Sequence, residues 1–461
     1  MVVVMDSRIL IVGHGTAGKA LAADITQRGG TVVGFLDDSS TGSAVLGTLA
    51  DVNEVVARHQ VDLAYFAIPS VDATTVRDFI NSVDVSAVDI AIIPRTHEIL
   101  SRETVDINDL TDVDVLDLVG RKPVKHDVLS AQAFVRGKRV LVTGAAGSIG
   151  SRLVKQLAAM GAEVVVCIDW WENGIFFLGE ELGGATDGLE FHIADIKNDL
   201  LLAQLFERHR PQVVFHAAAY KHVPLMQANP IEAVNNNVWG TLNLMQLATR
   251  FEVENFVYVS TDKAVNPVNV MGTTKRIGEM MMQAIAAANP GTAFNAVRFG
   301  NVIQSNGSVM QTFRSQISKR QPLTVTHPDI TRFFMTIDEA SHLVIQSAIV
   351  GDAGDIFVLD MGEPVKILDL ATSLIHAVDP TLSVEFVGLR PGEKMFEELS
   401  YEPDKVAATP NSKIFVVRDA QDFDTAEFMA KILELLAATR SYSIGSTETV
   451  ERLRSLGFAI Q

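Results

Sequence analysis

The chain has 461 residues, of which 48% are hydrophobic and 20% are charged, and its formal net charge is −18. This length exceeds that of an ordinary single domain and predicts two or three domains with ample hydrophobic core. The acidic balance argues against nucleic acid as a partner, because phosphate backbones are bound by basic surfaces. It does not argue against a nucleotide, whose phosphates a local glycine loop can hold.

The cysteine content and the hydropathy of the sequence indicate where in the cell the protein is expected. Cys167 is the only cysteine and lies in an apolar run, so we expect a buried core residue, no intramolecular disulfide and no cysteine-based zinc site. The sequence has no apolar stretch of the roughly 18 residues that a membrane span requires, and residues 1–5 are too short for a signal peptide. We therefore expect a cytoplasmic protein, placed at the cytoplasmic face of the inner membrane if this sequence is part of a longer one.

A dinucleotide-type pattern opens the chain. A buried strand is predicted at residues 8–12, followed by a Gly-x-Gly-x-x-Gly turn at 13–18. A helix is predicted at 19–25, and a second strand at 31–36 ends at Asp37. Strand, glycine turn, helix, strand and acid in this order are typical of a dinucleotide-binding unit. The pattern leaves open whether this unit binds a nucleotide, a regulatory ligand or nothing.

The same pattern then starts again. A strand is predicted at 139–143, a Gly-x-x-Gly-x-x-Gly turn at 144–150, and a helix from residue 151. The second strand, 164–168, ends at Asp169. Glycine at such a turn allows backbone angles that a β-carbon forbids and lets backbone amides approach a pyrophosphate.

The two patterns together predict an α/β protein with two Rossmann-like, doubly wound parallel sheets in series, the second carrying a small C-terminal α/β lobe for the substrate. We assign residues 1–118 to the first domain, 119–136 to a polar, proline-containing linker, and 137–461 to the second domain. From residue 413 onward the pattern predicts one strand and two amphipathic helices without chemistry of their own.

Asp169 points to the cofactor. A carboxylate at this strand end can accept hydrogen bonds from both ribose hydroxyls and would repel a 2′-phosphate, which favours NAD over NADP. Asp195 after a strand suits an adenine contact, and small residues closing a later strand let the backbone lie against a flat cofactor. The expected cofactor-binding residues are Gly144, Gly147, Ser148, Ile149, Gly150, Asp169, Asp195, Ile196, Ala217, Ala218 and, for the nicotinamide ribose, Lys275.

Met271 stands four residues before Lys275, where dehydrogenases of the short-chain type place tyrosine in a Tyr-x-x-x-Lys pair. The spacing puts both side chains on one helix face, where the lysine helps the phenol to take a hydroxyl proton. Methionine cannot do this. The proton chemistry is therefore expected at Thr261, Asp262 and Lys263, which follow a predicted strand at a turn.

A resemblance to a known family rests on these residues and on further segments. The second glycine turn, residues 216–226, 261–263, 298–302 and the segments 327–335 and 388–394 together resemble the bacterial UDP-N-acetylglucosamine 4,6-dehydratases. These are extended short-chain dehydrogenase/reductase enzymes of polysaccharide synthesis. Long members resemble this chain in having an N-terminal Rossmann-like domain and methionine in place of the tyrosine. They usually also begin with transmembrane helices, which this sequence lacks.

The resemblance implies a role for each residue in an NAD-dependent 4,6-dehydration of a UDP-N-acetylhexosamine. Thr261 would bond the C4 hydroxyl, Asp262 would be the acid at C6, and Lys263 the base at C5. Lys263 must then be partly neutral, through desolvation or a neighbouring cation, and Asp262 protonated part of the time. The expected substrate-binding residues are Lys221, His222, Asn301, Arg332, Arg390 and Glu393, with Arg390 on the diphosphate. We expect no metal site. We expect the chain to form a homo-oligomer.

Three positions depart from the family pattern. Gln304 and Asn306 stand where the family has glycine and arginine, and Gln227 stands where it usually has glutamate. Two other functions therefore stay under consideration. A nucleotide-sugar 4-epimerase would need no acid and base for elimination, and it usually relies on the missing tyrosine. A non-catalytic nucleotide sensor would explain the departures, but not the presence of Thr261 through Lys263.

Overall fold

The computed structural model describes residues 7–27, 29–40, 42–68, 79, 82–84, 88–92, 128–184, 188–303, 305, 307–378, 381–400, 406–417 and 423–461. The chain divides into two compact units, one of residues 1–122, 309–330 and 365–387, the other of residues 123–308, 331–364 and 388–461. Residues 119–127 of the predicted linker lie outside the described part. Among the described residues, no helix combines the length and apolar character needed to cross a membrane.

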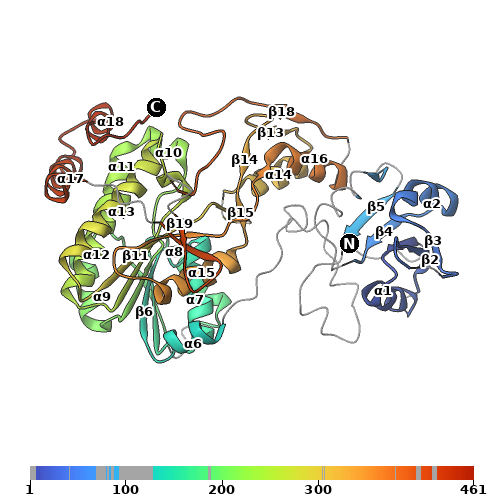
Figure 1. The fold of residues 1–461 in the computed structure, drawn as a ribbon, viewed down its shortest axis with the longest axis horizontal. Coiled ribbons are helices and arrows are strands. Elements are labelled where there is room, and N and C mark those ends of the chain that lie inside the picture. Colours follow the sequence, from blue (N-terminus) through green and yellow to red (C-terminus); the bar gives the residue numbers. More distant parts are fainter. Residues whose placement is uncertain are drawn as a thin grey trace. The chain divides into compact units, whose positions relative to one another are not determined.

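The described residues of the first unit form a parallel sheet of five strands in the order β3-β2-β1-β4-β5 (Figure 1). The predicted strands at 8–12 and 31–36 are confirmed, and the first helix is longer than predicted at both ends. Ile9 and Ile11 of β1 pack against Leu21 and Ile25 of α1, which closes the βαβ unit. The elements are β1 Arg8–Val12, α1 Thr16–Gln27, β2 Thr31–Leu36, β3 Val45–Gly47, α2 Val52–His59, β4 Leu63–Phe66 and β5 Asp89–Ile92.

Two later segments of the chain also belong to this unit. They form a small α/β arrangement in which β13 and β18 pair in parallel. Gln316 of α14 holds β13 by accepting a hydrogen bond from the Thr324 amide at 3.2 Å. The elements are α14 Val309–Ser318, β13 Leu323–Val325, β17 Val365–Lys366, α16 Ile367–Val378 and β18 Val384–Phe386.

The second unit contains a sheet of nine strands among its described residues, in the order β19-β20-β16-β11-β10-β9-β6-β7-β8 (Figure 1). The strands from β16 to β8 are parallel, and β20 and β19 are added antiparallel at one end. The strands are β6 Arg139–Thr143, β7 Val164–Asp169, β8 Leu189–Ile193, β9 Val213–His216, β10 Asn255–Val259, β11 Ala293–Arg298, β16 Ile356–Leu359, β19 Val406–Ala408 and β20 Ile414–Val417.

Helices cover both faces of this sheet, as the near-continuous apolar strands require. Successive residues of β7 alternate between two hydrophobic clusters: Val166 and Ile168 belong to one, Val165 and the buried Cys167 to the other. The helices are α6 Val128–Val135, α7 Ser148–Ala159, α8 Glu172–Glu181, α9 Asp199–His209, α10 Val223–Ala228, α11 Pro230–Val234, α12 Gly240–Arg250, α13 Val270–Ala288, α15 Ile337–Val350, α17 Thr425–Arg440 and α18 Ser446–Ser455.

The strand order of the second sheet indicates where a ligand site is expected. It reverses between β6 and β9, and ligands of such sheets bind in the crevice outside the carboxyl ends of the strands at that point. The glycine turn follows β6, and residues 261–263 follow β10, so both lie at the same edge of the sheet. The two helices predicted for the tail are confirmed as α17 and α18.

Candidate functional site

A tight glycine turn follows β6. Gly144 has φ +68°, and a Cβ there would lie 2.6 Å from the amide nitrogen of Ala218. A Cβ on Gly150 would lie 1.9 Å from the carbonyl oxygen of Gly144. Only glycine fits these two positions, so the turn lies directly against the end of β9. Helix α7 begins at Ser148, which brings its N-terminal amides and positive dipole end to this turn.

Asp169 connects the second strand to this turn. Its Oδ2 accepts a hydrogen bond from the Ala146 amide at 3.0 Å, and its Oδ1 accepts one from the Trp171 amide at 3.0 Å. A carboxylate has about four acceptor positions, so capacity for two ribose hydroxyls is left. The glycine turn of residues 144–150, called the glycine cradle below, and this acid together fit a dinucleotide without a 2′-phosphate.

The first unit repeats this bond. The His14 amide donates to Oδ2 of Asp37 at 2.7 Å, over the same separation of 23 residues as in the second unit. Hydrogen bonds from the amides of His14, Ser39 and Ser40 outweigh burial and lower the pKa of Asp37 to about 2. The acid and the glycine turn of the first unit are therefore arranged as in a dinucleotide-binding unit.

The other residues expected at the cofactor differ in how far their side chains are accessible. Ala218 lies against the glycine turn, and Asp195 is half-exposed, with its Oδ2 3.4 Å from the ammonium of Lys197. Ile196 is 5% exposed and packs so closely on Gly240 that a Cβ there would lie 2.5 Å from its Cδ1. The side chain of Ile196 thus belongs to the core, and only its backbone can face a ligand.

The three predicted catalytic residues meet at one oxygen atom. Oδ1 of Asp262 accepts hydrogen bonds from the hydroxyl of Thr261 and the ammonium of Lys263, each at 2.9 Å. The turn predicted after Ser260 is a short 3-10 helix, Asp262–Ala264, capped by Thr261. Asp262 is 0% exposed, and its Oδ2 has no hydrogen-bond partner in the described chain.

Lys263 contacts two further side chains. Its Nζ lies 3.5 Å from Oδ1 of Asn301 and 3.5 Å from Oε1 of Glu397. Burial lowers the pKa of this lysine, but the carboxylates of Asp262 and Glu397 outweigh burial and hold the pKa above its usual value. The base role requires a partly neutral Lys263, whereas in the ligand-free chain these two carboxylates favour its ammonium form.

Glu397 was not expected from the sequence, and it brings Arg332 into the site. Arg332 lies 3.2 Å from Glu393 and 4.0 Å from Glu397, and it donates a hydrogen bond to the Met395 carbonyl at 3.2 Å. It thereby holds the loop that carries both acids. Glu397 comes four residues after Glu393, and this acidic spacing after a glycine-proline loop was the only signal available in the sequence.

The exposed end of the same loop carries Arg390. The backbone amide of Arg390 donates to Oε2 of Glu393 at 3.1 Å, while its side chain is exposed. Of the two expected arginines, Arg332 is thus committed to acidic side chains, and Arg390 is the one accessible from solvent.

Met271 and Lys275 lie in the first turns of α13, and both are buried, at 4% and 5% exposure. Met271 is part of the hydrophobic core. The ammonium nitrogen of Lys275 lies 4.0 Å from the ring centroid of Tyr258. Burial, only partly offset by the carboxylate of Glu279, lowers the pKa of Lys275 to about 7.

A second residue missed from the sequence lies beneath the site. Glu279, fully buried, pairs with Arg298 at 2.7 Å and with Arg276 at 3.1 Å, and it accepts a hydrogen bond from the hydroxyl of Ser260 at 2.7 Å. Although burial raises its pKa, these partners lower it to about 2. Glu279 is four residues after Lys275, which places it on the same helix face and was the signal for it.

Lys221 and His222 are exposed at the start of α10. Partial desolvation of its ammonium group and the positive charge of Lys263 lower the pKa of Lys221, although the residue as a whole is exposed. Gln227 has a structural role, because it donates to the Gln461 carbonyl at 2.8 Å and accepts from the Val270 amide at 3.1 Å. The departures at residues 304 and 306 lie outside the described residues.

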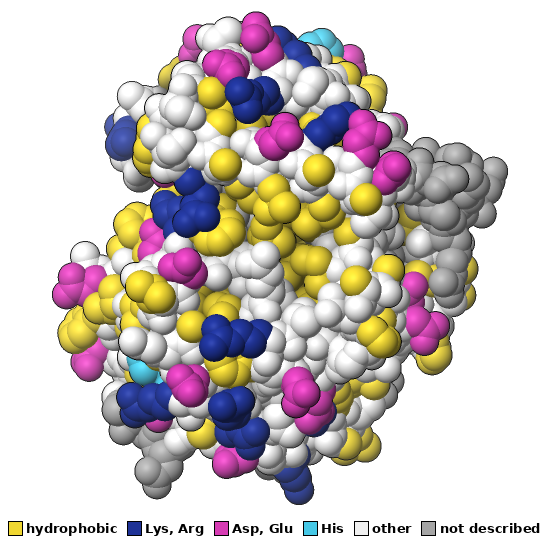
Figure 2. Space-filling view, turned by 90° about the vertical axis from the view of Figure 1, so that its left-hand side faces the viewer, with side chains coloured by type: hydrophobic (Ala, Val, Ile, Leu, Met, Phe, Trp, Pro, Cys, Tyr) yellow, Lys and Arg dark blue, Asp and Glu magenta, His cyan; other side chains and the backbone are white. Residues whose placement is uncertain are grey.

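On the face shown in Figure 2, Lys and Arg side chains stand among Asp and Glu side chains, without a broad basic stripe over its described part.

Two family models match the chain. Residues 140–419 match the family described as polysaccharide biosynthesis protein, and residues 3–94 match a CoA-binding domain. The chain is 40% identical over 407 residues to the capsular polysaccharide biosynthesis protein CapD of Staphylococcus aureus, covering 85% of this chain and 68% of CapD.

Two further proteins are similar over about two thirds of the chain. The UDP-glucose 4-epimerase of Rickettsia conorii is 32% identical over 323 residues, covering 68% of this chain and 92% of the epimerase. A double mutant of DesIV, the dTDP-glucose 4,6-dehydratase of Streptomyces venezuelae with NAD bound, gives a TM-score of 0.52 at 22% identity, covering 66% of this chain and 98% of DesIV. At that identity the match to DesIV shows the fold alone.

Proposed function

Because this chain belongs to the polysaccharide biosynthesis protein family, we propose that it is an NAD-dependent dehydratase that converts a UDP-N-acetylhexosamine, most simply UDP-N-acetylglucosamine, into the 4-keto-6-deoxy sugar. The observation that carries the proposal is the meeting of Thr261, Asp262 and Lys263 at one carboxylate oxygen. An acid and a base side by side at the carboxyl end of β10 are what a C5/C6 elimination needs.

The cofactor part of the proposal rests on the glycine cradle of residues 144–150 and on Asp169. When bound, NAD supplies the site that takes the hydride from C4 and returns it at C6. The chain's own residues hold and orient the cofactor. Lys275, buried beside Tyr258, is proposed to bond the nicotinamide ribose and to keep the local potential positive.

The chain's acid and base act on the sugar. Thr261 bonds the C4 hydroxyl through its own hydroxyl group, and the C4 hydroxyl proton passes to Thr261 or to water as C4 becomes a ketone. Lys263 removes the C5 proton, which is acidic because of that ketone, and returns a proton to C5 when the hydride is added at C6. Asp262 protonates the departing C6 hydroxyl, which leaves as water. Gly300 leaves room at the carboxyl group, since a Cβ at that position would lie 3.2 Å from Oδ2 of Asp262.

The contact between Asp262 and Lys263 solves a problem of protonation. In the ligand-free chain the neighbouring carboxylates favour the ammonium form of Lys263, and an ammonium cannot act as a base. Transfer of one proton over the 2.9 Å from its Nζ to Oδ1 of Asp262 gives a neutral amine and a carboxylic acid together. Closure of the site around a sugar favours this neutral pair, because a low dielectric penalises charge.

Met271 favours elimination over epimerisation. A 4-epimerase of this fold usually takes the C4 proton with the tyrosine whose place Met271 fills, and it has no use for a second acid and base. The buried, apolar position of Met271 leaves no ionisable group there. The same residues also argue against a sensor, which would not need Asp262 and Lys263 in contact.

The test is to incubate the purified chain with UDP-N-acetylglucosamine and to follow the product by mass spectrometry and by the base-induced absorbance of a 4-keto sugar. Loss of one water from the sugar, abolished in Lys263→Ala, supports the proposal. An isobaric C4 epimer contradicts it in favour of the epimerase. Binding of the nucleotide sugar without turnover contradicts it in favour of the sensor.

The diphosphate of the nucleotide-sugar substrate is proposed to contact Arg390. Arg390 is exposed on the loop whose other end reaches Lys263 through Glu397, so we assign it to the diphosphate. Replacement by lysine keeps the charge but loses the bidentate geometry. Arg390→Lys is therefore expected to raise KM with little change in kcat, and an unchanged KM contradicts the assignment.

A further inference from the structure

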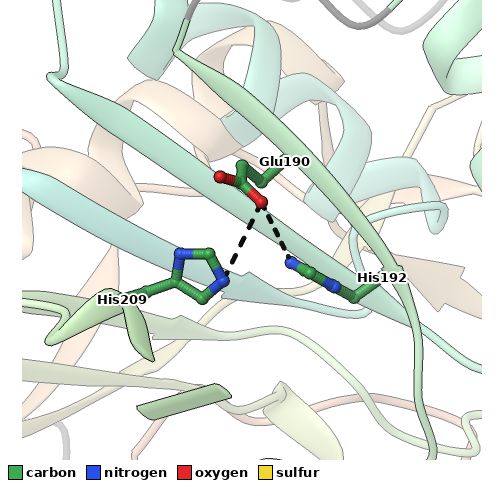
Figure 3. A group of neighbouring side chains, drawn as sticks. All are labelled: Glu190, His192 and His209. Carbon is green, nitrogen blue, oxygen red and sulfur yellow. Dashed lines mark ion pairs between the residues drawn. The ribbon is translucent and has the colours of Figure 1, made fainter. Parts of the chain in front are cut away.

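Two histidines and a glutamate lie together on the β8–α9 unit. Glu190 and His192 are alternate residues of β8 and therefore project from the same face of the sheet. His209 is the last residue of α9, which returns along that strand. Figure 3 shows the three side chains converging on one carboxylate oxygen of Glu190. None of them belongs to the proposed cofactor or sugar site.

The distances in this cluster suit a small cation. Oε2 of Glu190 lies 3.5 Å from Nε2 of His192 and 3.9 Å from Nε2 of His209. One ligand atom from each of the three residues lies within 4.8 Å of the others. Ligand atoms around a tetrahedral zinc ion with bonds of about 2.1 Å are about 3.4 Å apart. Small side-chain rotations are enough to bring the three atoms to that spacing.

The hydrogen bonding of the two imidazoles is incomplete. His209 is 7% exposed, and its Nε2 is buried without a hydrogen-bond partner in the described chain, as is Nε2 of His192. A buried polar atom without a partner costs free energy, so such atoms usually have a ligand, a water or an ion. Here both nitrogens face the same carboxylate oxygen, which is the donor set that zinc prefers.

We propose that Glu190, His192 and His209 form a binding site for a divalent transition-metal ion of the zinc class, with a fourth position open to water. Glu190 and His192 are partly exposed, so the ion can enter from solvent. The bound ion would join the edge strand β8 to the end of α9.

Arg208 gives the competing explanation of the cluster. Its Nη2 lies 3.8 Å from Oε2 of Glu190, so the carboxylate is also part of a surface ion pair. The Arg208 side chain is 68% exposed, and an exposed pair of this kind contributes little to stability. The two explanations predict different effects of removing this arginine on zinc affinity. A metal site gains affinity when the cation next to its carboxylate is lost, whereas an ion-pair cluster has no affinity for metal to gain.

The experiment uses the full chain, stripped of metal by a chelator and titrated with zinc chloride in a calorimeter. We expect one zinc ion per chain and a rise in Tm on zinc addition. His192→Ala and Glu190→Gln should each weaken binding by at least about tenfold, and Arg208→Ala should tighten it by about two- to fivefold. His59→Ala, which removes a histidine of α2 in the first unit, is the control and should leave the affinity unchanged.

Each contrary outcome overturns the site. These outcomes are no zinc binding by the unaltered chain, an unchanged affinity in the double variant of Glu190→Gln and His192→Ala, or an equal loss in His59→Ala. His209→Gln, which keeps a buried polar side chain, should also lose binding, and its circular dichroism spectrum separates loss of metal from loss of fold. The readouts do not depend on enzymatic turnover, so failure of the dehydratase proposal leaves this test intact.

Discussion

The carboxylate of Glu397 lies 3.5 Å from the ammonium nitrogen of Lys263. With Asp262 it raises the pKa of a lysine that burial alone would lower. Glu397→Gln removes one of the two negative charges, so the pKa of Lys263 falls and its neutral form appears at lower pH. The alkaline-side rise of kcat should therefore move to lower pH, as measured by a pH profile of the dehydration rate.

The control for this change is Glu398→Gln. Glu398 is half-exposed and pairs with Lys394 at 3.3 Å, away from Lys263. It should leave the pH profile in place. A profile that stays in place in Glu397→Gln as well would show that Glu397 only holds the loop.

Lys263 itself is expected to be needed for chemistry and not for cofactor binding. Lys263→Ala removes the base at C5 and should lower the turnover rate by at least about 10² to 10⁴-fold, the range for loss of a general base. NAD affinity, measured by calorimetry, should be retained, because the cradle at 144–150 is untouched. A variant that keeps its rate would place the base at another residue.

Met271 is expected to be replaceable without gain. Met271→Tyr adds a ring and a hydroxyl to a position that is 4% exposed in the core. Such enlargement of a packed core side chain costs about 1–3 kcal/mol, so thermal unfolding should occur at lower temperature. The dehydration rate should not rise. A large gain in rate would mean that the chain is an impaired form of a tyrosine-dependent enzyme.

Most of the fold follows from local patterns. The glycine turns were a usable signal because their close backbone contacts admit no side chain. At Gly144 and Gly150 of the second unit, an added Cβ would collide with backbone atoms. Apolar runs bounded by these turns predict the strands of both units. The cluster of residues 261–263 was also predictable, because those residues follow one strand at a turn.

The rest of the site depends on contacts between distant segments. Glu397 reaches Lys263 from a loop far along the chain, and Gln227 joins the start of α13 to the C-terminal residue. The effect of Glu397 on the pKa of Lys263 could not be foreseen for the same reason. His209 and Glu190 come together only when α9 packs along β8, so the spacing of ligands in the sequence gave no signal.

The buried Lys275 is expected to lower the free energy of unfolding at neutral pH. Its pKa is about 7 in the folded chain against 10.5 when unperturbed. Between these values the unfolded chain holds a proton that the folded chain has released, so this group makes stability increase as pH rises from about 7 to about 10.5. Below about 7 the full cost is present, of the order of 5 kcal/mol.

Lys275→Met should therefore raise Tm at neutral pH while abolishing turnover, with methionine occupying the same apolar space above Tyr258. The pH dependence of denaturant unfolding between neutral and alkaline pH should become flatter in the variant. A variant that is less stable than the unaltered chain at neutral pH would show that the contact between the lysine and the ring outweighs burial.

Glu279 should act in the opposite direction, as a source of stability under the site. Its folded-state pKa of about 2 lies below the unperturbed 4.5. Its contribution is therefore fully present above pH 4.5 and is lost as pH falls toward about 2. Glu279→Gln takes the carboxylate partner from Arg298 and Arg276 inside the protein, and breaking such a buried pair costs about 3–5 kcal/mol.

Urea unfolding at several pH values measures this contribution. The difference between the unaltered chain and Glu279→Gln should be large at neutral pH and should shrink as the pH falls below 4.5. Ser260→Ala, which removes only one hydrogen bond to the same carboxylate, should cost about 1 kcal/mol. A difference that stays constant down to acid pH would mean that Glu279 contributes by shape and packing. Its charge would then not be what holds α13, and with it Lys275, against β11.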